Sequence, residues 1–142
     1  MNEVMRREMD EAILAGERAL ESLKLAQGKL DSARNWGIFD IFGGDLFGTF
    51  MKHSRMQDAS NYMESAKRNL KIFQKELRDV DQKIHLDVIV GGFLSFADFF
   101  FDGLVADMLV HSKINEIREQ VHDAICHVES LLTELKYQRE EL

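Results

Sequence analysis

The residues of this chain best suited to chemistry are three aspartates and a histidine within one apolar stretch: Asp98, Asp102, Asp107 and His111. Carboxylates and imidazoles are metal-ligand types. Residues four apart share one face of a helix, which applies to Asp98 with Asp102 and to Asp107 with His111. One hypothesis is therefore a helical protein that binds a metal or a small ligand through this cluster.

The same segment also has a structural interpretation, because its pattern recurs earlier in the chain. Residues 98–112 are DFFFDGLVADMLVHS, and residues 40–54 are DIFGGDLFGTFMKHS. In the earlier copy a glycine and a threonine stand in place of Asp102 and Asp107, so the two copies do not offer equivalent ligands. An aspartate before a helical run can accept from free backbone N–H groups and complement the helix dipole. We therefore favour the structural interpretation over the metal site.

A second group of possible ligands follows in the last segment, where His122 and Cys126 are four residues apart. One cysteine and one histidine cannot complete a tetrahedral zinc site, and His127 points about 100° away from Cys126 around a helix. We interpret this group as a solvated helix face. Ser54 and Ser112 follow histidines but lack the strained turn of a nucleophilic serine. We expect no catalytic residue, no cofactor and no enzymatic activity.

Composition narrows the class of protein further. The 142 residues include 25 acidic and 18 basic side chains, a formal net charge of -7, so no nucleic-acid partner is expected. The single cysteine cannot form an intrachain disulfide, and the start of the chain lacks the apolar run of a signal peptide. We therefore expect a cytoplasmic protein. Three aspartates interrupt the most apolar window, residues 88–110, which predicts no transmembrane segment.

Hydrophobic periodicity predicts three long helices in this proline-free chain. Apolar or small residues recur at alternating steps of three and four in three segments, which is the spacing of a helix-packing seam. The seams are Met5, Met9, Ala12, Gly16, Ala19, Leu23, Ala26, Leu30 and Ala33; Met56, Ala59, Met63, Ala66, Leu70, Phe73, Leu77, Val80 and Ile84; and Ile114, Ile117, Val121, Ala124, Val128, Leu131 and Leu135. We expect helices over about residues 2–35, 45–84 and 98–142, joined by corners at 36–44 and 85–97.

The second and third segments form an internal repeat, about residues 36–84 and 94–142. The offset is 58 residues, as between His53 and His111, and it carries the second seam onto the third. Because each corner is short, we expect consecutive helices to run antiparallel. The predicted fold class is all-α: a single domain of residues 1–142 that forms an elongated antiparallel three-helix bundle of the coiled-coil type.

The two corners contain more aromatic residues than the ends of a three-helix rod can bury. Phe99, Phe100 and Phe101 are consecutive and cannot all face one core. Exposed aromatic patches mark interfaces. We therefore predict a helical protein-interaction or scaffolding module that self-associates as a dimer, or binds another helical protein, through its corners. The predicted interface residues are Trp36, Phe39, Phe42, Phe47, Phe93, Phe96, Phe99, Phe100 and Phe101.

Several short segments resemble a group of uncharacterised bacterial helical proteins. They are Trp36-Gly37, Asp40, Gly43-Gly44, Lys52-His53-Ser54 and Phe100-Phe101-Asp102-Gly103, within about residues 33–120. The resemblance implies a bacterial helical protein. It implies no activity, cofactor or site residue.

Overall fold

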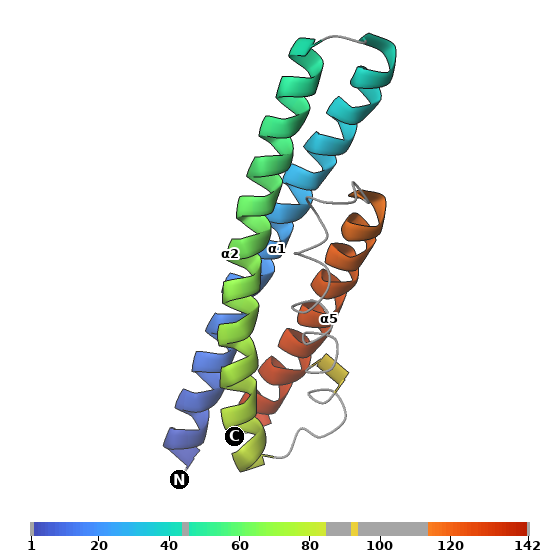
Figure 1. Cartoon of the computed structure of the whole chain (residues 1–142). Coiled ribbons are helices and arrows are strands. Elements are labelled where there is room, and N and C mark those ends of the chain that lie inside the picture. The colour runs from blue at the N-terminus through green and yellow to red at the C-terminus, as the bar shows by residue number, and fades with distance from the viewer. Residues whose placement is uncertain (1, 44–45, 85–91, 94–113, 142) are drawn as a thin grey trace.

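The computed structural model of this chain describes residues 2–43, 46–84, 92–93 and 114–141. Its helices are α1 (Asn2–Gly43), α2 (Leu46–Ile84) and α5 (Ile114–Glu141). Side chains are described for residues 3–32, 58–80, 92–93 and 117–141. The three helices form an elongated bundle (Figure 1), which confirms the predicted all-α, three-helix fold.

The first helix is longer than its sequence pattern predicts. A stop was expected at residues 35–37, but α1 continues to Gly43, and α2 begins at Leu46, close to its predicted start. A glycine in a helix interior costs only about 1 kcal/mol relative to alanine. That is too little to end a long helix in a segment without proline, so Gly37 is accommodated within α1.

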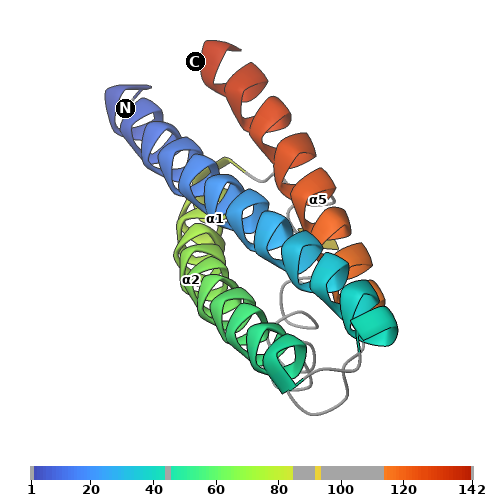
Figure 2. The same cartoon turned by 90° about the horizontal axis from the view of Figure 1, so that it is seen from above.

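The core follows the predicted seams through the part of the bundle where side chains are described. Where side chains are described, every seam position is buried from Met9 to Leu30, from Ala59 to Val80 and from Ile117 to Leu135. Helix α1 contacts both of the other helices and lies between them (Figure 2). Its seam is rich in alanine and glycine, and these small residues allow both neighbours to approach its backbone closely.

All three helices pack closely together at Gly16. A Cβ atom at this position would lie 2.7 Å from Cδ2 of Leu132 in α5 and 2.9 Å from the ring of Phe73 in α2. Ordinary carbon contacts are about 3.5–4.0 Å. Glycine at residue 16 therefore sets the distance at which both helices pack on α1.

Contacts between α1 and α2 show that these helices run antiparallel. Asn69 of α2 donates a hydrogen bond from Nδ2 to the hydroxyl of Ser22 in α1. Seven residues earlier in α2, the ring of Tyr62 lies beneath the ammonium of Lys29, 5.3 Å from Nζ to the ring centroid. As the residue number falls in α2 it rises in α1, as expected for a helical hairpin.

Helix α5 is also antiparallel to α1, and it is therefore parallel to α2. Arg118 near its start pairs with Asp31, and Arg139 near its end pairs with Asp10, where Nε to Oδ1 is 3.0 Å. The expectation that the second and third helices run antiparallel is wrong, because α5 begins at the same end of the bundle as α2. The two chain termini consequently lie together at the opposite end (Figure 1).

The parallel arrangement places α2 and α5 at matching levels on α1. Tyr62 of α2 lies level with Lys29 of α1, so residue 60 of α2 lies level with Asp31, because the two helices are antiparallel. Arg118 of α5 also lies level with Asp31. Positions 58 residues apart in the sequence therefore pack at the same height against α1. The internal repeat of residues 36–84 and 94–142 stays a prediction.

Candidate functional site

Most of the predicted site residues lie where the structure describes no side chain. The predicted ligands Asp98, Asp102, Asp107 and His111 are outside the described residues, as are the predicted interface residues Phe96, Phe99, Phe100 and Phe101. Trp36, Phe39 and Phe42 belong to the described backbone of α1, and Phe47 belongs to that of α2. The ligand cluster stays a prediction.

Phe93 is the one predicted interface residue whose side chain is described. It is only 1% exposed, and its ring centroid lies 5.3 Å from that of Phe73, with the ring planes tilted by 58°. Tilted aromatic pairs at this separation are stabilising. The chain's own core therefore covers Phe93, which counts against a role for this ring in binding a partner.

The end of the bundle where α1 and α2 join extends beyond α5. Arg118 of α5 pairs with Asp31 of α1, and α5 begins one turn earlier, at Ile114, so its start lies level with about residue 35 of α1. The last eight residues of α1, 36–43, therefore continue about 12 Å past the start of α5. Figure 1 shows this overhang, and of the described helices only α1 and α2 reach it. We call residues 36–43 and 46–50 the hairpin end. It contains Trp36, Phe39, Phe42 and Phe47.

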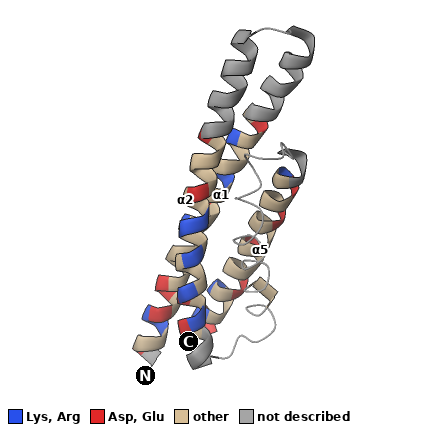
Figure 3. Ribbon diagram, viewed as in Figure 1, with Lys and Arg blue, Asp and Glu red and all other residues tan. Residues whose placement is uncertain are grey.

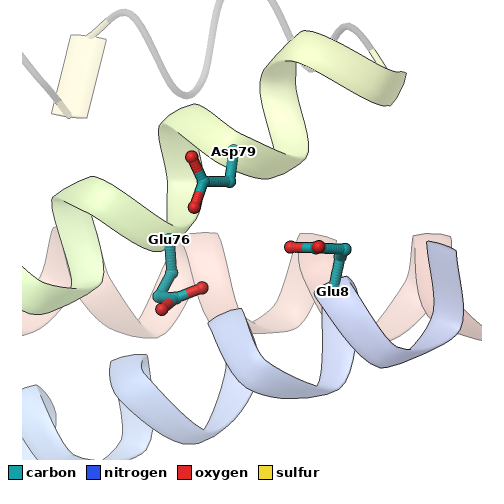
Figure 4. Close-up of side chains that lie close together, drawn as sticks. All are labelled: Glu8, Glu76 and Asp79. Atoms are coloured by element: carbon teal, nitrogen blue, oxygen red, sulfur yellow. The ribbon is translucent and has the colours of Figure 1, made fainter. Parts of the chain in front are cut away.

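At the other end of the hairpin, three carboxylates from α1 and α2 converge. One carboxylate oxygen from each of Glu8, Glu76 and Asp79 lies within 4.8 Å of the other two, and all three residues are half-buried (Figure 4). Burial, followed by the charges of Glu11, Asp79 and Glu8, raises the pKa of Glu76 above its ordinary 4.5. A proton or a hard cation would relieve this repulsion. Sequence reasoning missed the cluster because it depends on how α1 and α2 align.

The thiol and imidazole singled out on α5 form a simple surface pair. Sγ of Cys126 is 3.7 Å from Nε2 of His122, and both residues are exposed. Within the described part of the chain, the carboxylate cluster is the only group of three or more possible metal ligands close enough to share an ion. The solvated helix face predicted for His122 and Cys126 is therefore confirmed.

A shallow groove runs between α1 and α2 on the outer side of the hairpin. Its volume is about 210 Å³, and it is lined by Glu11, Leu14, Ala15, Arg18, Asn69, Ile72 and Glu76. Leu14 is 48% exposed and Ile72 is 54% exposed. Glu11, Arg18 and Glu76 also line the groove, so both signs of charge accompany the apolar side chains. Acidic and basic residues are interspersed along the described parts of α1 and α2 (Figure 3). The groove thus combines an apolar centre with charged ends.

Comparison with protein-family models, curated proteins and solved structures gives no match to this chain. In the part of the chain that the structure describes, no helix combines the length and the apolar character needed to cross a bilayer.

Proposed function

We propose that this chain is a non-enzymatic helical interaction or scaffolding module that self-associates through its aromatic corners. The observation that carries the proposal is the hairpin end, where two helices continue beyond the third. Four of the predicted interface aromatics lie in that two-helix segment. Of the described helices only these two reach the rings, and two helices have less interior than three in which to bury them. In this proposal a second copy supplies further apolar surface.

The proposed role is non-enzymatic. The thiol and imidazole of Cys126 and His122, which the sequence singled out as possible ligands on α5, lie exposed at the surface. The remaining predictions belong to the same proposal: a cytoplasmic, bacterial protein that forms a homodimer or binds another helical protein through the corners. The aromatic residues of the second corner, Phe96 and Phe99–Phe101, are included in the proposed interface.

The test is the mass of the protein in solution, measured by light scattering at about 100 µM, above the micromolar range of specific interfaces. The change is Phe39→Ser with Phe42→Ser at the hairpin end, and the matched control is Tyr137→Ser, which removes an exposed aromatic ring from α5. We expect the wild type and the control to exceed the monomer mass and the hairpin-end variant to fall below both. Circular dichroism checks that every variant remains helical.

A hairpin-end variant with the wild-type mass would contradict self-association through this corner. The alternative function, ligand binding through Asp98, Asp102, Asp107 and His111, predicts that purified protein contains stoichiometric metal. Elemental analysis distinguishes the two proposals, because self-association through aromatic residues requires no metal.

A further inference from the structure

The face of α1 that points away from the core carries a second seam. Seven residues recur there at alternating steps of three and four, and we call them the outer stripe: Val4, Arg7, Glu11, Leu14, Arg18, Glu21 and Leu25. All seven are exposed, and Val4 and Leu25 are 55% and 50% exposed. This spacing follows one helix face over about 32 Å. None of the three ion pairs described between α1 and α5 uses a residue of the stripe.

The outer stripe is complementary to itself when it is reversed. Along α1 the residue types are apolar, basic, acidic, apolar, basic, acidic and apolar. If two copies of α1 lie antiparallel with their Leu14 side chains at the centre, each apolar residue of one stripe faces an apolar residue of the other. Each charged residue then faces a residue of opposite charge. The facing pairs are Val4 with Leu25, Arg7 with Glu21, Glu11 with Arg18, and Leu14 with Leu14. A parallel pairing in register would instead bring like charges together, which is unfavourable.

Helix α2 repeats the same order of charge beside the stripe. Half-exposed Ile72 lies in the groove with Leu14, and Arg68 and Glu76 stand four residues to either side of it. Glu76 is on the side of Glu11, where the carboxylate cluster lies, and Arg68 is on the side of Arg18. A reversed second copy therefore places its Arg68 towards the end of the hairpin where Glu8, Glu76 and Asp79 cluster.

We propose that α1 of one copy binds α1 of a second copy, antiparallel, about a two-fold axis at Leu14. A two-fold interface uses the same patch on both copies, and the palindromic order of this stripe meets that condition. A planar anionic surface, such as lipid, would meet the acidic residues of the stripe as well as the basic ones. The alternating charges thus fit a reversed copy better than a membrane.

This lateral contact is independent of the proposed contact at the hairpin end. The outer stripe ends at Leu25, and the hairpin end begins at residue 36. Because apolar side chains occupy only three of its seven positions, the lateral contact should be weak and should weaken further as salt screens its charge pairs. Both contacts together would join copies into larger assemblies.

The experiment uses two full-length variants, Glu11→Arg and Arg18→Glu, alone and mixed. In either variant by itself, both Glu11–Arg18 pairs of the dimer become like-charge pairs. In the mixture, the two arginines of one variant face the two glutamates of the other. We expect each variant to self-associate about tenfold more weakly than the wild type, which is about 1.4 kcal/mol. We expect the mixture to recover the wild-type affinity.

Native mass spectrometry of the mixture separates this contact from any other, because the two variants differ in mass. Association through the hairpin end alone gives mixed dimers as about half of all dimers, the random proportion. When both stripe variants also carry Phe39→Ser with Phe42→Ser, so that only the lateral contact remains, the tenfold preference raises that fraction to about nine-tenths. Glu119→Arg on α5 mixed with Arg78→Glu on α2 is the charge-matched control, since both residues are exposed and off the stripe. It should stay at the random proportion.

Two results would overturn the lateral contact. One is a random proportion of mixed dimers from the stripe variants in the Phe39→Ser, Phe42→Ser background, and the other is a wild type that stays monomeric at about 100 µM and low salt. The hairpin-end variant Phe39→Ser with Phe42→Ser keeps the stripe intact, so the preference for mixed dimers should persist in that background. The hairpin-end contact can therefore be removed while the lateral contact is measured, and the lateral contact can be removed while the hairpin-end contact is measured.

Discussion

Gly16 allows a test of the packing at the centre of the bundle, through Gly16→Ala. The added Cβ would lie 2.7 Å from Leu132 and 2.9 Å from Phe73, so it overlaps both by at least about 0.6 Å. Phe73 is fully buried and lies against the Phe93 ring, and Leu132 is 4% exposed. Both side chains are buried in the core, so relieving the overlap must shift these side chains or the helices that carry them.

The size of the effect follows from two opposing terms. Overpacking a dense core by one methyl costs about 1–3 kcal/mol. Alanine stabilises a helix interior by about 1 kcal/mol relative to glycine. Gly28→Ala isolates the second term, because Gly28 is exposed on the same helix and an added Cβ there has nothing within 4 Å. The free energy of unfolding should therefore be about 1–3 kcal/mol lower in Gly16→Ala than in Gly28→Ala.

Urea denaturation followed by circular dichroism measures both variants against the wild type. The melting temperature of Gly28→Ala should be higher than that of the wild type, by roughly 3 °C for each kcal/mol of added stability in a chain of this size. Leu132→Ala should cost less in the Gly16→Ala background than in the wild type, since the new methyl then fills part of the space that the leucine vacates. Equal stability of Gly16→Ala and Gly28→Ala would refute the close three-helix contact at residue 16.

Three further substitutions test other parts of the bundle. Because the pKa of Glu76 is raised, the folded state holds this proton more tightly than the unfolded chain, so ionisation weakens the fold as pH rises above 4.5. Glu76→Gln should then be more stable than the wild type at pH 7, and urea denaturation at a series of pH values should show the difference shrinking as the pH falls below 4.5. Phe93→Ala should cost about 3 kcal/mol in the same assay, because its buried ring packs on Phe73; a near-neutral effect would contradict that burial. Arg139→Ala should change stability by less than about 1 kcal/mol, because its ion pair with Asp10 is solvent-exposed, and a larger loss would show that the pair is coupled to the core.

The buried positions could be predicted from the sequence because helix packing repeats a local pattern. Seam residues such as Leu23, Leu70 and Val128 are buried as predicted, since spacing of three and four places them on one helix face whatever the partner helix is. The same rule identifies exposed faces, and it could have found the outer stripe from Val4 to Leu25. Helix ends were less predictable, because tertiary pairing overrides the weak preferences of residues such as Gly37.

The carboxylate cluster could not be predicted, for a physical reason. Glu8 is separated from Glu76 and Asp79 by more than sixty residues, and only the antiparallel alignment of α1 with α2 brings their oxygens within 4.8 Å. No local rule fixes that alignment to within one turn. The burial of Phe93 against Phe73 likewise depends on where the chain returns after α2.

The sequence by itself determined that this protein is built from long amphipathic helices and which face of each helix is buried, because those properties follow from residue spacing along one helix. Only the tertiary structure decided that α5 runs parallel to α2, that three helices meet at Gly16, and that the hairpin end extends beyond α5. These features depend on how separate helices align, and the free energy of that alignment is spread over contacts between residues far apart in the chain.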